Sequence, residues 1–388
     1  MRYGRSIRHL WALADDATFL NHGSFGACPK EVLDEQDRIR RRMETAPDAF
    51  FRNEIMPGED VTALRAAVSA IAGFVNLEGT QLAFVENATL GVQAVLRSIP
   101  LAPGDQVLIT DHTYNAVRLM VEARCGETGA MPITARIGIP ESDDQIVERI
   151  LAAVTPSTRV AIVDHITSPT ALVFPLDRML PEMRGRGVRV IVDGAHAIGQ
   201  IPLDLGTLRP DWYVSNLHKW LFAPKGTAIL HVSDEMAPAT RPNVVSHYHA
   251  MAFPQAFDYT GTRDNSGWLA APAALRFFES LGPRALRKYQ KELLASATEC
   301  LGTIGVRPIA SAGLGSAMRS FLLPQRRPAT SDDAVTLMRT FWERDRVQVH
   351  ASAFDGRLLT RISAQAYVEG ADIDRYRDAL DRHGWPGR

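Results

Sequence analysis

The first part of the chain, from about Pro57 to Ser233, alternates helical patterns with short apolar runs. Residues 60–74 and 89–99 repeat apolar positions at the spacing of an amphipathic helix. Runs rich in valine and isoleucine have the length of buried strands, at 81–86, 105–110, 159–166, 188–196 and 227–232. Because strands alternate with helices, the pattern predicts βαβ units and a mostly parallel sheet with helices on both faces.

The pattern changes after the polar segment Tyr259–Gly267. A helical stretch over about 268–304 is followed by three apparent strands and a closing helix, at 317–324, 347–354, 357–363 and 371–383. This order predicts a smaller α+β domain. We therefore expect an N-terminal arm over residues 1–20, a large α/β domain over 21–282 and a small domain over 283–388.

Polar residues gather where the predicted strands end. Each apolar stretch leads into groups that donate or accept protons, in ENAT (86–89), DHTYN (111–115), DHITSPT (164–170), DGAHAIG (193–199) and SNLHKW (215–220). In α/β sheets the carboxyl ends of the strands form the binding crevice. The five segments are therefore expected to converge on one site.

Composition narrows the class of partner. The chain has 388 residues with 43 basic and 44 acidic side chains, and its formal net charge of -1 does not attract nucleic acid or an anionic membrane surface. The apolar run of the N-terminus is broken by Asp15 and Asp16, which does not fit a signal peptide, and no run is long enough to cross a membrane. Small molecules and copies of the chain itself are the expected partners.

Cysteine and histidine spacing predicts neither disulfides nor a metal site. The cysteines lie far apart in the sequence, at Cys28, Cys125 and Cys300, which fits a reducing cytoplasm. His247 and His249 have a spacing that puts both on one strand face, but no third ligand of suitable spacing follows. We expect no metal and a cytoplasmic location.

Asp193 and Lys219 carry the chemistry that this pattern suggests. Asp193 follows three apolar residues, so its carboxylate is expected in a largely dry site. It needs a partner there, because burying an unpaired charge costs on the order of several kcal/mol of folding free energy. Lys219 comes one βα step later, and a lysine in an apolar pocket becomes a nucleophilic amine because its pKa falls. Together they suggest a carbonyl cofactor, with lysine forming a Schiff base and aspartate keeping a pyridine nitrogen protonated. A structural Asp193–Lys219 ion pair is the alternative.

These residues belong to a longer ordered set of motifs. The set includes FLNHGSFGACP, ENATLGVQAV, DHITSPTALVFPL, VDGAHAIGQIPLDL, HKWLFAPKG, YTGTRD and RISAQAYVEGADIDR. In this order they resemble class V of the pyridoxal-phosphate enzymes of aminotransferase fold, and within it the isopenicillin N epimerase-like group. The resemblance covers nearly the whole chain. It implies fold type I, with a seven-stranded-type sheet in the large domain, and pyridoxal 5'-phosphate (PLP) as the cofactor.

The resemblance implies roles around the cofactor ring. Lys219 carries the cofactor as a Schiff base, and Asp193 pairs with the pyridine nitrogen. His196 stands where relatives commonly have a glutamine that bonds the ring hydroxyl. Tyr114 matches the residue that stacks on the ring face, with His112 as the second choice.

The phosphate of the cofactor is expected at the start of the helix over 89–99. The backbone N–H groups of Ala88 and Thr89 open that helix and favour an anion, and the Thr89 hydroxyl adds a further donor. Asn216 and His218 match family positions that also reach the phosphate. Thr262 matches one that the neighbouring subunit supplies, so the resemblance implies a homodimer with shared sites.

Two further matches concern the substrate. Ser168 matches a polar residue near the ring hydroxyl and the substrate, and Thr167 is equally suited by its chemistry. Arg361 matches the arginine that takes the α-carboxylate of an amino acid, since a planar guanidinium can bind a carboxylate with two bonds. His22 and His350 are also expected near the substrate.

The reaction is predicted from the same resemblance. Cysteine desulfurases of this class carry a catalytic cysteine shortly before the carboxylate-binding arginine, whereas residues 342–357 contain none. An epimerase or racemase is expected, with acid/base groups on both faces of the α-carbon. Lys219 serves one face, and Tyr114, His22 or His350 the other. A β-eliminating C–S lyase, an aminotransferase and a non-catalytic binding protein are the alternatives.

Overall fold

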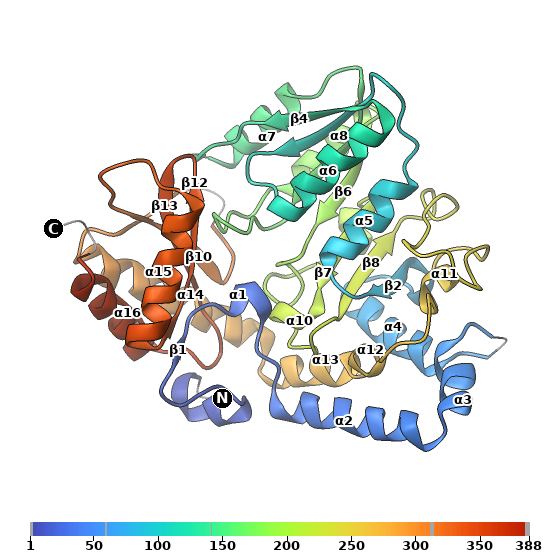
Figure 1. Cartoon of the computed structure of the whole chain (residues 1–388), viewed down its shortest axis with the longest axis horizontal. Coiled ribbons are helices and arrows are strands. Elements are labelled where there is room, and N and C mark those ends of the chain that lie inside the picture. Colours follow the sequence, from blue (N-terminus) through green and yellow to red (C-terminus); the bar gives the residue numbers. More distant parts are fainter. Residues whose placement is uncertain (1–2, 59, 141, 311–313, 385–388) are drawn as a thin grey trace.

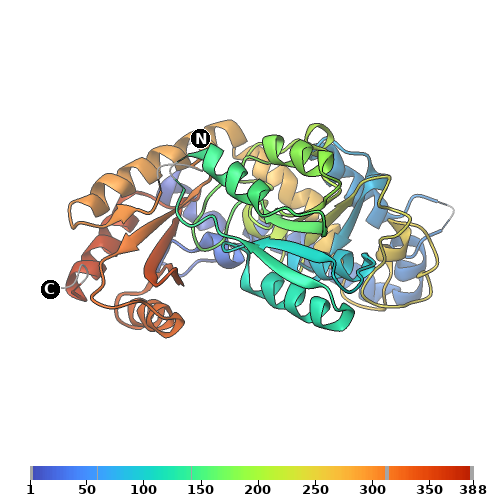
Figure 2. The same cartoon turned by 90° about the horizontal axis from the view of Figure 1, so that it is seen from above.

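The computed structural model describes residues 3–58, 60–140, 142–310 and 314–384, which form three sheets, and the two larger sheets lie side by side. The larger sheet occupies the right of Figure 1, and the smaller one, drawn in orange and red, lies at the left. Figure 2 shows the same separation from above.

The larger sheet has seven strands in the order β2-β8-β7-β6-β5-β3-β4. Strand β8 is antiparallel to both of its neighbours, whereas the other pairs are parallel. The five predicted strands are present as β2 (Leu82–Val85), β3 (Gln106–Thr110), β5 (Thr158–Asp164), β6 (Arg189–Asp193) and β8 (Ala228–Val232). The other two are β4 (Met131–Ala135) and β7 (Trp212–Asn216). The predicted α/β fold with a mostly parallel sheet is confirmed.

The strands alternate between two hydrophobic layers because successive side chains point to opposite faces of a sheet. In β5, Val160 and Ile162 pack into one layer, and Ala161 and Val163 pack into the other. Helices α5 (Ala88–Ser98) and α6 (Asn115–Thr128) cover the first layer. The second is covered by α4 (Ala63–Phe74), α8 (Leu176–Gly185) and α13 (Ala271–Ser280).

Polar caps set where the predicted helices begin. The Thr62 side chain accepts a hydrogen bond from the N–H of Arg65, so α4 begins at Ala63 and not at residue 60. Asn87 caps α5 in the same way through the N–H of Leu90.

The remaining helices of this part are α1 (His22–Phe25), α2 (Lys30–Thr45), α3 (Pro47–Phe50), α7 (Asp143–Ala152), α9 (Leu205–Leu208), α10 (Leu217–Trp220), α11 (Gln255–Asp258) and α12 (Ser266–Leu269). Short non-α turns occur at η1 (Gly4–Leu10), η2 (Phe51–Ile55) and η3 (Gly79–Gln81).

The smaller sheet is antiparallel, in the order β12-β13-β10-β9. Its strands are β9 (Arg307–Pro308), β10 (Met318–Leu323), β12 (His350–Phe354) and β13 (Arg357–Ser363), and its helices are α14 (Pro283–Gly302), α15 (Ser331–Asp345) and α16 (Gly370–Arg382). The helical stretch expected over 268–304 is divided because Gly282 adopts a left-handed conformation directly before α14. The exact domain boundary near Pro283 stays a prediction.

The N-terminal arm joins the small sheet region to the rest of the chain. Strand β1 (Thr18–Phe19) pairs in parallel with β11 (Val347–Gln348), so the run expected as one strand over 347–354 is divided into β11 and β12. The arm then passes into α1, which lies between the two sheets in Figure 1. Among the described residues, no helix is both long and apolar enough to span a membrane.

Candidate active site

Lys219 lies in the short helix α10, directly after β7. Its Nζ is 3.3 Å from Nε2 of His196, which follows the neighbouring strand β6. Removal from water and the nearby Arg361 charge lower the pKa of Lys219 to about 7, and the Asp193 carboxylate only partly opposes this. A large fraction of the amine is therefore neutral and nucleophilic at neutral pH.

Two glycines allow the chain to pack against the backbone around Lys219. A side chain at Gly26, which has φ +70°, would place its Cβ 2.1 Å from the carbonyl oxygen of His218. A side chain at Gly199, with φ +82°, would meet the carbonyl oxygen of Trp220 at 2.5 Å. Only glycine fits at either position, so the backbone that carries Lys219 is held from two sides.

Asp193 ends β6 and is 5% exposed. Its Oδ1 accepts a hydrogen bond of 2.9 Å from the N–H of Ala195. Burial raises the pKa of Asp193, while the Ala195 bond and the Lys219 charge lower it. Among the described residues, no cation lies within ion-pair distance of this carboxylate, so a cationic group in the site would stabilise its charged form.

A second buried carboxyl, Asp164, was not predicted. It is paired in register with Asp193 across β5 and β6 and is 4% exposed. Burial and the Asp193 charge raise the pKa of Asp164 well above its usual value. The sequence signal was present, because Asp164 also ends an apolar run, in RVAIVDHI.

His196 presents an N–H to Lys219. Its Nδ1 accepts a hydrogen bond of 3.4 Å from the indole N–H of Trp220. Burial and the charges of Lys219 and Arg361 lower the pKa of His196 well below its usual value, so the ring is neutral. The proton of a neutral ring whose Nδ1 accepts is on Nε2, which therefore faces the amine as a donor.

Arg361 is 1% exposed and forms bonds with neutral partners only. One terminal nitrogen donates to the backbone oxygen and to Oγ of Ser168, the latter at 3.3 Å. The other donates to Asn21 Oδ1 at 3.4 Å and to Ser24 Oγ at 3.3 Å. Its Nε is buried and has no partner among the described residues. Because a buried guanidinium without a carboxylate is costly, this position fits a ligand anion.

The start of α5 offers donors to a second anion. The N–H of Ala88 donates to Oδ1 of Asn216 at 2.9 Å, so this N–H is already used, and the amide NH₂ of Asn216 remains as a donor. Nδ1 of His218 donates to the Thr227 carbonyl at 3.1 Å. Burial and the Lys219 charge lower the pKa of His218 to about 4. Thr89 lies in the first turn of α5, where N–H groups point toward a bound anion.

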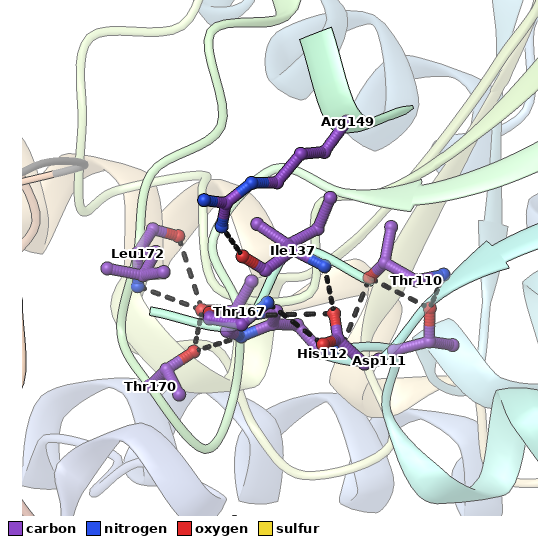
Figure 3. Close-up of polar contacts among 10 residues, drawn as sticks. Thr110, Asp111, His112, Ile137, Arg149, Thr167, Thr170 and Leu172 are labelled. Carbon is purple, nitrogen blue, oxygen red and sulfur yellow. Dashed lines mark hydrogen bonds and ion pairs between the residues drawn. The ribbon is translucent and has the colours of Figure 1, made fainter. Parts of the chain in front are cut away.

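The two alternative site residues, His112 and Thr167, lie in a closed network (Figure 3). His112 shares hydrogen bonds of 2.7 Å with Thr170 Oγ1 and with the Gly138 carbonyl. Thr167 Oγ1 contacts Thr170 Oγ1 at 2.7 Å and accepts from the N–H of Leu172 at 2.8 Å. Both side chains therefore hold the loops together. Tyr114, preferred over His112 for stacking on the ring, lies at the start of α6 and is 47% exposed. Ser168, the counterpart of Thr167, contacts Arg361.

His22 and His350 occupy different environments. His22 is fully buried, with Nδ1 2.7 Å from the Tyr367 hydroxyl and Nε2 2.8 Å from the Lys219 carbonyl oxygen. Both ring nitrogens are thus engaged, and the Nε2 bond holds the backbone of Lys219. His350 is directly opposite Arg361 in the β12–β13 pair, which places both side chains on one face of the sheet. Burial and the charges of Arg361 and Lys219 lower the pKa of His350 well below its usual value, so it is a neutral base.

Thr262 lies in the segment between α11 and α12. It is exposed, and its hydroxyl is 2.7 Å from the hydroxyl of Tyr259. Its expected contact with a neighbouring subunit stays a prediction. Within the described ranges, no group of three histidine, cysteine, aspartate or glutamate side chains is arranged to hold a metal ion.

The family model described as aminotransferase class V matches residues 27–325. The chain belongs to this family. It is a class V enzyme that depends on PLP, as the resemblance in the sequence implied. The residues fit that cofactor, since the site offers a nucleophilic amine, a buried carboxylate for a protonated ring nitrogen and a helix start for a phosphate.

Relatives of this class V enzyme have different activities. It is 34% identical to isopenicillin N epimerase of Amycolatopsis lactamdurans, over 97% of both chains. It is 32% identical to putative L-cysteine desulfhydrase 1 of Oryza sativa subsp. japonica, over 94% of this chain and 82% of the relative. Among solved structures, a C-DES variant with glycine covalently linked to its PLP cofactor matches with a TM-score of 0.79 at 20% identity, covering 96% of this chain and 98% of that one. This last likeness shows the fold.

Proposed function

We propose that this enzyme inverts the α-carbon of an amino acid or an amino-acid-derived substrate, as an epimerase or racemase. The observation that carries the proposal is the placement of His350 directly across from Arg361, with the Lys219 charge close enough to lower the pKa of His350. If Arg361 holds the α-carboxylate, the substrate has a base of low pKa near it in addition to Lys219. Inversion requires two such groups on opposite faces of the reacting carbon.

Each residue has a part in this proposal. Bound PLP stabilises negative charge at the α-carbon of the substrate. The Arg361 guanidinium fixes the carboxylate and so orients the α-carbon. Nζ of Lys219 removes or returns the α-proton on one face, and Nε2 or Nδ1 of His350 does so on the other.

Roles around the cofactor follow from the same geometry. Asp193 stabilises a protonated ring nitrogen, and the Nε2–H of His196 donates to the ring hydroxyl oxygen. Thr89 and Asn216 bind the phosphate, and Tyr114 stacks on the ring. A neutral His218 uses its one N–H on the Thr227 carbonyl, so it donates to the phosphate only when the bound dianion keeps Nε2 protonated. The Ala88 N–H was expected to bind the phosphate itself, but it is already bonded to Asn216, so we assign it the orientation of that amide toward the phosphate.

A C–S lyase is the second candidate. The rice relative is named as an L-cysteine desulfhydrase, and the same pair of bases would serve elimination. Lys219 would remove the α-proton and, once protonated, would pass it to the departing sulfur, with His350 as a neutral base beside the carboxylate. Transfer of the amino group to PLP is the third candidate reaction, and such an aminotransferase would leave the cofactor in its amine form.

Product analysis separates these reactions. The PLP-loaded protein is incubated with single L- and D-amino acids and chiral cysteine conjugates, and the products are resolved by chiral chromatography with mass spectrometry. The proposal predicts the opposite enantiomer in equal amount to the substrate consumed, with no keto acid. Keto acid with ammonia and a thiol would establish the lyase, and keto acid with PLP in its amine form the aminotransferase. Either result would overturn the epimerase.

We further propose a homodimer in which Thr262 reaches the site of the neighbouring subunit. Exposed apolar side chains support this, since Phe25 is 72% and Val245 is 78% exposed. A cytoplasmic location also stays a prediction.

A further inference from the structure

A basic cavity of about 540 Å³ lies between α14 and the start of β10. Its charged lining comes from Arg287, Lys288 and Lys291 of α14 and from Arg319 of β10. None of the residues that we assign to PLP or to the substrate lines it.

The positive charges around this basic cavity are poorly compensated. Among the described residues, Arg287 and Lys291 have no ion pair, and the acid nearest to Lys288 is Glu292 at 3.8 Å. Arg319 donates only to neutral groups, the Leu294 carbonyl at 3.3 Å and Thr298 Oγ1 at 2.8 Å. No described carboxylate lines the cavity.

The guanidinium groups of Arg287 and Arg319 have lost part of their hydration, which favours an anionic ligand beside them. Burial lowers the pKa of both Arg287 and Arg319, which means that neither guanidinium is fully compensated for lost hydration. The Nε of Arg319 is buried and has no partner in the described part of the chain. An anion in the cavity would relieve the mutual repulsion of the cations that line it.

The base of the cavity is preformed by two buried glutamines. Gln200 donates through Nε2 to the His196 carbonyl at 2.6 Å and accepts at Oε1 from the N–H of Ala317 at 2.7 Å. Gln290 donates through Nε2 to the Ala364 carbonyl at 3.2 Å. These bonds join segments of both predicted domains and fix the two glutamines, whereas Lys288 and Lys291 reach the cavity as exposed side chains.

We propose that the basic cavity binds a compact anion with two or more negative charges. Phosphate monoesters and small polycarboxylates share this chemistry. Four cations line this one cavity, and three of them have no ion pair among the described residues, which favours a multivalent anion over a monovalent one. This binding does not depend on which reaction the enzyme catalyses.

Calorimetric titration of the PLP-loaded protein tests this proposal. Inorganic phosphate and citrate serve as the probes, against chloride at matched ionic strength, because screening alone weakens exposed charges. The test variant is Arg287→Glu with Lys291→Glu. The matched control is Arg284→Glu with Lys30→Glu, which changes the net charge equally at exposed positions outside the cavity.

Saturable binding of phosphate or citrate that falls at least tenfold in the test variant, and is unchanged in the control, supports the site. Tighter binding of phosphate identifies phosphate esters as the ligand class, and tighter binding of citrate identifies polycarboxylates. Unfolding transitions check that the variants fold, and Arg287→Gln with Lys291→Gln replaces a test variant that does not. Heats that match chloride, or equal binding by test and control variants, would overturn the proposal.

Discussion

Lys219 is poised to react because its amine is held near neutrality by its surroundings. The pKa of about 7 comes from burial and from Arg361, so the neutral amine is abundant above pH 7. We therefore expect covalent attachment of PLP to the cofactor-free protein to accelerate as the pH rises from 6 to 8 and then to level off. The rate is followed by the absorbance of PLP, with Lys219→Ala as the control that attaches none. A rate that keeps rising toward pH 10 would contradict the lowered pKa.

Arg361 allows a test of carboxylate binding. In Arg361→Lys a point charge replaces the planar guanidinium, and the loss of a charged hydrogen bond costs about 1.5–3 kcal/mol. Amino-acid affinity is expected to fall roughly 10- to 100-fold, since each 1.4 kcal/mol is a factor of ten. Spectral titration of the PLP-loaded variant measures this. Unchanged PLP affinity in the same variant excludes a general loss of structure, and unchanged amino-acid affinity would remove Arg361 from the substrate site.

The sequence alone could indicate Asp193 and Lys219 because each follows an apolar strand whose end is directed to the crevice. It could not separate His22 from His350. The partners that occupy both nitrogens of His22, Tyr367 and the Lys219 carbonyl, come from distant parts of the chain. Such contacts depend on tertiary packing, which no local pattern encodes.

At the scale of elements, the short helix α10 depends on the glycine contacts around it. Gly26→Ala places a Cβ against the His218 carbonyl at a residue with positive φ. The expected loss is about 1–3 kcal/mol in the free energy of unfolding, with weaker PLP binding. Gly73→Ala is the matched control, because a Cβ at this exposed position of α4 meets nothing within 4 Å. Urea unfolding of both variants measures the difference. Equal stability of the two variants would show that Gly26 does not hold α10.

Most strands could be predicted, but strands β4 and β7 and the direction of β8 were not. Strand β4 lies at the sheet edge with mostly exposed positions, so it lacks the apolar run of a buried strand. The antiparallel direction of β8 leaves no trace in its composition, because all five of its residues are buried as in a parallel strand. Helix α15 was overlooked although Thr330 and Asp333 form a capping box at its start.

At the scale of the whole molecule, a mixed dimer tests whether Thr262 acts across the subunit interface. Lys219→Ala and Thr262→Val chains are mixed, unfolded and refolded together, and the mixed dimer is purified by two affinity tags. If Thr262 serves the partner's site, one site of the mixed dimer regains both native residues and binds PLP with wild-type affinity. Fluorescence titration with PLP measures the affinity of that site. A mixed dimer with no wild-type site would place Thr262 in its own subunit's site, and a monomer in sedimentation would exclude the dimer.

The central claim is that Lys219 and His350 handle the α-proton on opposite faces of the substrate. Exchange of the α-hydrogen in heavy water, measured by mass spectrometry and chiral chromatography in a His350→Gln variant, tests it most directly, with the exposed His247→Gln as the control. The account predicts that His350→Gln exchanges the α-hydrogen of one enantiomer without inverting it, whereas the control inverts both. Inversion by His350→Gln at the rate of the control would contradict the account.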